Sequence, residues 1–175
     1  MRSLLGFLGL GSDESAPRGA GDSASVRAIT ARLESLAPGR ARFLASFAFL
    51  LGRIAPADID VSEAEVETMR RIVRETGGLD AEATDLVVSI ATERTTRHGH
   101  TENFRVAREF KQLSSREERR RLIGCLFAVG AADDSITAIE EHEIRRVADE
   151  LGLSPRELAD ERSAWSASRS VLQSS

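Results

Sequence analysis

The sequence has 175 residues, of which 41% are hydrophobic and 30% are charged, and its formal net charge is -4 at pH 7. This composition is typical of one soluble domain, and the acidic balance disfavours non-specific binding to nucleic acid, which needs positive charge facing the phosphates. The single cysteine, Cys125, excludes an intramolecular disulfide and any CxxC motif, and no apolar run reaches the ~18 residues that cross a bilayer.

Residues 1–24 are expected to form a flexible leader. Residues 1–10 (MRSLLGFLGL) are apolar, and the stretch that follows is rich in Gly, Ser, Ala and Asp, as flexible linkers are. The apolar segment is short, is interrupted by two glycines and lacks a clear cleavage site, so we interpret it as a leader of a cytoplasmic protein. The alternative is contact with a membrane or a partner through its apolar side chains. These are Leu4, Leu5, Phe7, Leu8 and Leu10.

From Ser25 onward, apolar residues recur at helical spacing and strand signals are nearly absent. The expected helices, in chain order, carry the apolar positions Val26 to Leu36, Phe43 to Ile54, Val66 to Val73, Leu86 to Ala91, Phe104 to Phe110, Leu122 to Ala132, Ile139 to Leu151, and Leu158 to Trp165. The second is apolar nearly all round, which predicts a central position. The sequence therefore predicts an all-α bundle of about seven to eight helices. The helical domain would cover 25–162, and in the tail, 163–175, the last helix would fray into disorder.

Two segments 75 residues apart resemble each other. Each follows a strongly apolar helix, passes through an acidic loop and opens an amphipathic helix. The matched pairs are Asp58 and Asp133, Val61 and Ile136, Ser62 and Thr137, and Glu65 and Glu140. The pattern predicts two pseudo-repeated helix–acidic loop–helix units, which would pack against each other about a pseudo-twofold axis.

The acidic loops have a capping interpretation and a metal-binding interpretation, and both can hold together. Ser62-x-x-Glu65 and Thr137-x-x-Glu140 have the pattern of capping boxes, which explains the hydroxyls and the glutamates. The additional aspartates are not needed for capping. Oxygen ligands on loops suit Ca²⁺ or Mg²⁺, although the spacing is not that of an EF-hand. The predicted ligands of a divalent cation are Asp58, Asp60, Glu65, Asp133, Asp134 and Glu140.

The second acidic loop has the most distinctive flanks. Residues 126–133 (LFAVGAAD) run into it, and residues 140–148 (EEHEIRRVA) follow it. With these motifs, the chain from about 42 to 159 resembles the TerB-like family of tellurite-resistance-associated proteins. The resemblance implies a helical fold of about seven helices, an acidic metal-binding site and a role in tellurite resistance or general stress response. Ile59 and Asp134 replace two family glycines, so the first loop is expected to differ in shape.

Other candidate sites have plainer explanations. Residues 98–100 (HGH), with Glu93 and Glu102 nearby, are expected to form an exposed turn rather than a transition-metal site. His142, among glutamates, is expected to be a charged surface position. Cys125 is expected to be a buried small hydrophobe, which disfavours tellurite reduction by thiol chemistry.

The basic run 116–121 (REERRR) is interpreted as a solvated face. The alternative is a surface for a partner or a nucleic acid. Because the run is interleaved with glutamates, we favour the solvated face and expect no nucleic-acid partner.

We therefore expect a non-enzymatic module that acts in stress response or tellurite resistance, holds a divalent cation of the Ca²⁺ or Mg²⁺ class and has an unidentified protein partner. The alternative is an interaction scaffold, or a co-chaperone-type adaptor, in which the acidic residues only cap helices. TerB-like domains occur beside co-chaperone J-domains, which favours that alternative. An enzyme is disfavoured, since nothing in the sequence marks a substrate pocket and the common catalytic motifs are absent.

Overall fold

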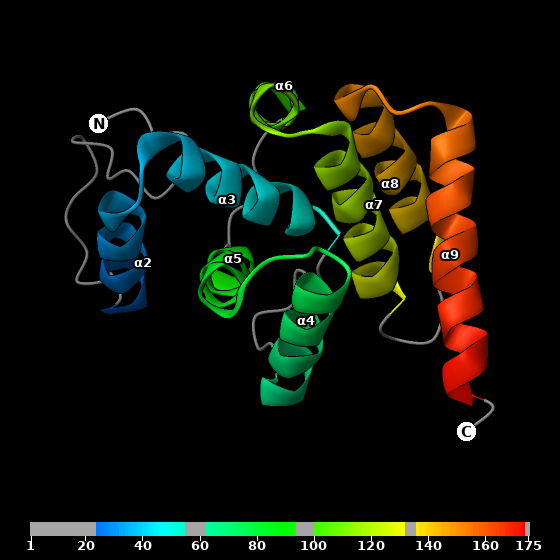
Figure 1. Cartoon of the computed structure of the whole chain (residues 1–175), viewed down its shortest axis with the longest axis horizontal. Coiled ribbons are helices and arrows are strands. Elements are labelled where there is room, and N and C mark those ends of the chain that lie inside the picture. Colours follow the sequence, from blue (N-terminus) through cyan, green and yellow to red (C-terminus); the bar gives the residue numbers. More distant parts are fainter. Residues whose placement is uncertain (1–23, 55–61, 94–99, 132–135, 174–175) are drawn as a thin grey trace.

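The computed structural model describes residues 24–54, 62–93, 100–131 and 136–173. These residues form eight α-helices and contain no strand, so the expected all-α bundle is confirmed (Figure 1). The helices are α2 (Ala24–Ser35), α3 (Pro38–Leu51), α4 (Glu63–Glu75), α5 (Ala81–Glu93), α6 (His100–Leu113), α7 (Arg116–Gly130), α8 (Ala138–Leu151) and α9 (Pro155–Gln173). The last helix continues to Gln173, through residues that we assigned to the tail.

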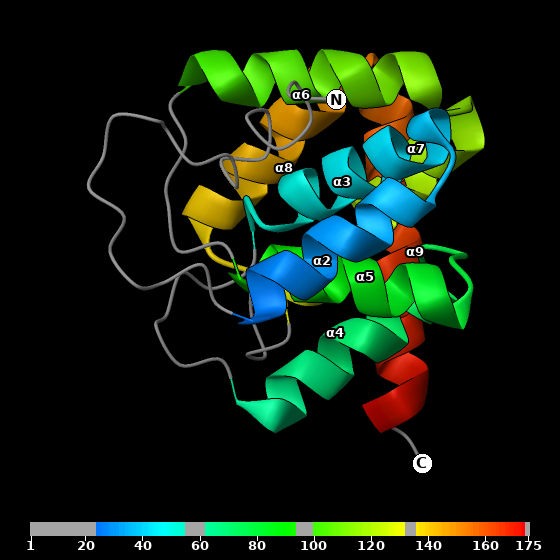
Figure 2. The same ribbon diagram turned by 90° about the vertical axis from the view of Figure 1, so that its left-hand side faces the viewer.

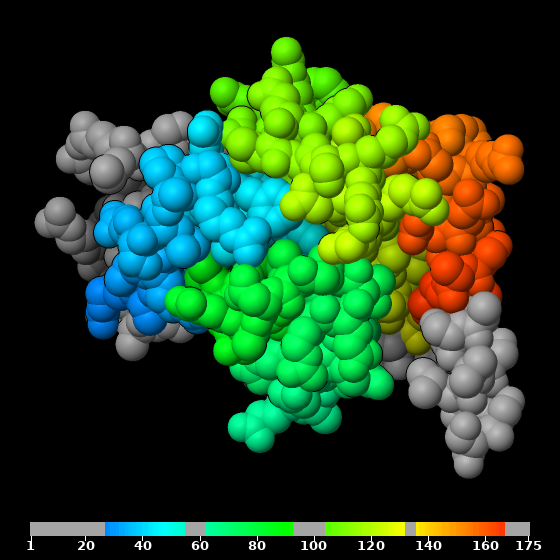
Figure 3. Space-filling view, viewed as in Figure 1, coloured from blue at the N-terminus to red at the C-terminus, as the bar shows by residue number. Residues whose placement is uncertain are grey.

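Helix α3 forms the centre of the bundle, as its apolar sequence predicted. Residues 43–51 are all buried, and α3 packs against α2, α5, α6 and α7. The only polar side chain in that stretch is Ser46, whose hydroxyl donates to the carbonyl of Arg42 at 2.7 Å. A hydroxyl bonded within its own helix adds no unpaired polar group to the core. Helices α2 and α9 lie at opposite ends of the molecule (Figures 1 and 3).

Helix α7 is the second strongly buried helix. Residues 122–127 are all buried, and α7 packs against α3, α4, α8 and α9. Each acidic loop thus follows a helix of the core and precedes an amphipathic helix, as the repeated pattern requires. The pseudo-twofold relation between the two units stays a prediction.

Capping boxes open several helices, and those predicted at Ser62 and Thr137 are confirmed. The Thr137 N–H donates to Glu140 Oε2 at 2.7 Å, and the Glu140 N–H donates to Thr137 Oγ1 at 3.2 Å. The same reciprocal pair of bonds joins Ser62 and Glu65. A cap of this kind contributes about 1 kcal/mol to stability. These bonds fix where α4 and α8 begin, directly after the two acidic loops.

The basic run 116–121 joins α7 to α9 instead of facing solvent alone. Nε of Arg116 lies 2.6 Å from Glu157, and Nε of Arg120 lies 2.7 Å from Glu161. Arg119 also donates to the carbonyl of Leu151, at the end of α8, at 3.0 Å. Our interpretation of this run was therefore incomplete. A charged side chain has the same sequence signature whether it faces water or a charged partner.

The contact between α7 and α9 is expected to weaken in acid. Arg116 donates two hydrogen bonds to the Glu157 carboxylate, and the Ser154 N–H and hydroxyl donate two more. These bonds lower the pKa of Glu157 from 4.5 to about 2. Because the folded pKa is depressed, the ionised group stabilises the fold above about pH 4.5, and this contribution is lost as the pH falls toward 2. Glu157→Gln should therefore destabilise the protein more at pH 7 than at pH 3, as measured by urea unfolding.

The matched control for this prediction is Glu75→Gln, at the exposed end of α4. This substitution should change the free energy of unfolding little at either pH. A loss for Glu157→Gln that is equal at pH 3 and pH 7 would contradict the assigned role of its carboxylate.

Within the described residues, no helix combines the length and the apolar character needed to cross a membrane.

Candidate functional site

The described residues that precede the two acidic loops lie beside each other. A Cβ atom added to Gly130, the last residue of α7, would lie 3.0 Å from Cγ2 of Ile54, three residues after the end of α3. The same Cβ would lie 3.9 Å from the carboxyl carbon of Glu140, in the first turn of α8. The end of α3, the end of α7 and the start of α8 therefore meet, and the glycine allows their close approach.

Other helix ends lie on the same side of the bundle. Figure 2 shows the C-terminal end of α3 and the N-terminal ends of α4, α6 and α8 on one side. Helix N-termini carry partial positive charge, which favours carboxylates nearby. The C-terminal ends of α3 and α7, which lie in the same region, carry partial negative charge, so helix ends of both signs meet beside the acidic loops.

Of the six predicted cation ligands, four lie outside the described residues. These are Asp58, Asp60, Asp133 and Asp134. Among the residues that the structure does describe, no group of three or more His, Cys, Asp or Glu side chains could hold a metal ion.

The two described candidates, Glu65 and Glu140, act in capping boxes. In each, one oxygen, Oε2, accepts bonds from both the N–H and the hydroxyl of the cap residue. The Ser62 hydroxyl and N–H lower the pKa of Glu65, which favours its ionised form. Since the caps engage Oε2 alone, they leave Oε1 of each carboxylate available to a further ligand.

A buried ion network anchors the end of α3 next to this region. The side chain of Arg53 is only 4% exposed. Its Nε donates to Glu143 at 2.7 Å, and its Nη1 donates to Glu150 at 2.6 Å. Arg146, between these glutamates on α8, lies 3.3 Å from Glu150. Two arginines and two glutamates balance in charge, and they bind the residues before the first acidic loop to the helix that follows the second.

The sequence pattern did not predict this network, although part of its signal was present. Glu143 and Glu150 are seven residues apart and share a face of a helix. Arg53 follows a long apolar run, where an arginine needs a partner if it is buried. Nothing in the sequence shows that these two features meet in the fold.

The remaining candidates behave as plain structural residues where the structure describes them. Cys125 is fully buried, as predicted, and burial raises the pKa of its thiol. A thiol that remains protonated is a poor nucleophile and a poor metal ligand. His142 is exposed on α8. Residues 98 and 99, and the side chains of Glu93 and Glu102, lie outside the described residues.

A family model described as tellurite resistance protein TerB matches residues 44–163, which is well over half of the chain. The chain belongs to the TerB family. The match extends from α3 into α9, so it includes both acidic loops and the network around Arg53. No curated protein and no solved structure matches the chain. The resemblance leads us to expect a glycine at positions 59 and 134, where this TerB sequence has Ile59 and Asp134. Both positions lie outside the described residues.

Proposed function

We propose that this TerB-family chain is a non-enzymatic cytoplasmic module that holds one divalent cation between its two acidic loops. The module would act in stress response or tellurite resistance and would work through a protein partner. The observation that carries the proposal is the contact of the helix ends at Ile54, Gly130 and Glu140, because both loops begin there.

The chemistry of the loops supports a hard cation. The candidate ligands are oxygen atoms of Asp58, Asp60, Glu65, Asp133, Asp134 and Glu140. Carboxylates held close together repel one another, and a divalent cation offsets that repulsion. Ca²⁺ accepts six to eight oxygen ligands and tolerates irregular geometry, whereas Mg²⁺ keeps several waters and needs fewer protein ligands. Capping and cation binding are compatible, since each cap engages only Oε2 of its glutamate.

The second candidate function is a metal-free scaffold or co-chaperone-type adaptor. The capping boxes favour it, because they account for Glu65 and Glu140 without any ion. The two candidates differ in one measurable property. A cation that binds only the folded state raises the unfolding temperature, whereas a scaffold without a cation is indifferent to the ion.

The proposal predicts that a divalent cation stabilises the metal-stripped protein. Millimolar Ca²⁺, Mg²⁺, Mn²⁺ and Zn²⁺ would be added separately, and thermal unfolding followed by circular dichroism. At a free concentration of about 100 times Kd, the gain is about 2.7 kcal/mol, which corresponds to a rise of roughly 5–10 °C for a chain of this size. Asp133→Asn should abolish the rise.

The matched control is Asp160→Asn, an exposed position on α9 that should leave the rise unchanged. If none of the four ions shifts the midpoint, the chain does not bind a cation in this way and the scaffold function takes its place.

A further inference from the structure

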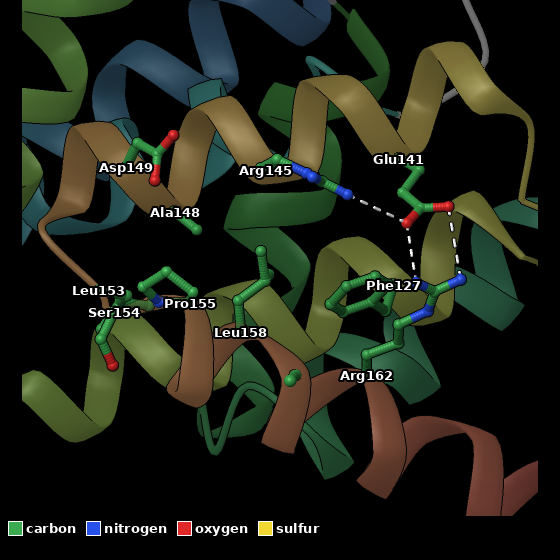
Figure 4. A pocket seen from close by; sticks show the side chains of 11 residues that line it. Phe127, Glu141, Arg145, Ala148, Asp149, Leu153, Ser154, Pro155, Leu158 and Arg162 are labelled. Carbon is green, nitrogen blue, oxygen red and sulfur yellow. Dashed lines mark hydrogen bonds and ion pairs between the residues drawn. The ribbon is translucent and has the colours of Figure 1, made fainter.

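Helices α8 and α9 leave a groove between them that the proposed cation site does not use. The two helices diverge from the turn at residues 152–154, and Figure 4 shows the open space between them. The groove has a volume of about 360 Å³. Its apolar lining includes Phe127 of α7, Ala148 of α8 and Leu158 of α9. Phe127 and Ala148 are almost fully buried, so the apolar surface that a ligand could contact comes from the partly exposed Leu158 and from the exposed Pro155 and Ala159.

Two arginines converge on one glutamate at the rim of the groove. Arg162 on α9 donates to both carboxylate oxygens of Glu141, at 2.8 and 3.4 Å. Arg145 reaches the same carboxylate only at 3.5 Å, which is a weak bond. Its side chain is 61% exposed. Within the described residues, Glu141 is thus held mainly by Arg162, and most of the five donors of Arg145 remain available.

The opposite end of the groove carries the opposite charge. Asp149, one turn after Arg145 on α8, is exposed there (Figure 4). The groove is therefore polarised along its length. A complementary occupant places an acidic side chain near Arg145, apolar side chains over Leu158 and a basic side chain near Asp149.

The shape of the groove favours a polypeptide over a small molecule. A second hollow, lined by Ala138, Glu141, His142 and Arg145, adjoins the first and shares two of its residues. Together they follow α8 from Ala138 to the turn at Leu153, a path of about 22 Å at 1.5 Å per residue. Small-molecule sites enclose most of their ligand, whereas both hollows along this path are partly open to solvent. A groove of this length suits a polypeptide segment that presents side chains at regular spacing.

We propose that the α8–α9 groove binds an amphipathic segment of a partner protein through its exposed apolar lining on α9 and through Arg145. Apolar residues of the segment pack on Leu158 and Ala159, and one of its carboxylates accepts hydrogen bonds from Arg145. This is the helix-in-groove mode of recognition, in which apolar contacts supply affinity and rim charges supply specificity. The proposal uses none of the cation ligands and stands whether or not the loops bind an ion.

The chain contains its own reporter for this site. Trp165 is its only tryptophan, and it has no tyrosine. The indole ring stacks on Phe127, with ring centroids 6.2 Å apart and an interplanar angle of 18°. Because Phe127 lines the groove, a segment bound there lies beside the ring on which Trp165 stacks and changes the environment of the only strong fluorophore.

The test selects peptides from a random phage-displayed library against the full chain, followed by titration of synthetic tryptophan-free peptides against Trp165 fluorescence. We expect selected peptides to combine an acidic residue with apolar residues at helical spacing. Arg145→Glu should weaken their binding by roughly tenfold, because it replaces an attraction by a repulsion. Arg105→Glu, at an exposed position on α6, should leave binding unchanged.

Arg145 is exposed, so Arg145→Glu is expected to fold, and circular dichroism checks this. The proposal is overturned if no peptide is selected, or if selected peptides bind Arg145→Glu as well as the wild type. Octanoate serves as a small amphiphilic anion. A change in Trp165 fluorescence with octanoate, without any selected peptide, assigns the groove to small ligands and also overturns the proposal.

Discussion

Replacing Arg53 by methionine is expected to lower the free energy of unfolding by about 3 kcal/mol, because it breaks a buried ion pair by removing one partner. Methionine keeps the apolar stem but leaves the Glu143 and Glu150 carboxylates with Arg146 alone. Those glutamate side chains are only 23% and 12% exposed, so water solvates them poorly. For a chain of this size, the melting temperature should fall by roughly 6–12 °C.

Arg71→Met serves as the control for the loss of a positive charge. Arg71 is exposed on α4, and its replacement should change stability by no more than about 0.5 kcal/mol. Arg53→Lys should lie between the two, since lysine keeps the charge but not the planar fork that reaches two carboxylates. Equal, small losses for Arg53→Met and Arg71→Met would show that the network contributes little to the fold.

The largest loss is expected from Phe110→Ala, at about 4 kcal/mol. The Phe110 side chain, on α6, is fully buried. Its ring lies 5.3 Å from that of Phe43 and 5.9 Å from that of Phe47, centroid to centroid. Both partners belong to the central helix α3, so the truncation removes the aromatic contacts that join α6 to the core. Urea unfolding measures the loss.

Phe104→Ala provides a matched control in the same helix. The Phe104 side chain is 57% exposed, so its truncation removes little buried surface. We expect a loss well under 1 kcal/mol for Phe104, since most exposed substitutions cost little. Similar losses at the two phenylalanines would contradict the placement of α6 on α3.

The parts of the fold that follow local rules could be predicted from the sequence. Apolar spacing located the helices, and the apolar run from Phe43 to Leu51 predicted the central one. The capping boxes at Ser62 and Thr137 were also predictable, because a cap depends on residues three positions apart. In each case the interacting groups are neighbours in sequence.

Features that depend on tertiary pairing could not be predicted in this way. Arg53 bonds to glutamates 90 and 97 residues away, and Arg116 bonds to one 41 residues away. The sequence contains no signal that selects these partners among the many charged residues. For the same reason, the groove between α8 and α9 depends on how two helices diverge, which helical periodicity does not encode.

The candidate cation site could be predicted only as a set of residues. The repeated acidic pattern suggested that the two loops work together, and the contact between Ile54 and Gly130 gives that suggestion a structural basis. Family membership supports the helical module and leaves cation binding as our proposal.

The central claim, one cation shared by two loops, is tested most directly by measuring the number of ions bound per chain. Isothermal titration of the metal-stripped protein would be performed for the wild type, Asp58→Asn and Asp133→Asn. We predict one ion per chain, with affinity weakened by either substitution, because both loops contribute ligands to the same ion. Absence of binding, or binding that is weakened by a substitution in only one loop, would contradict a site shared between them.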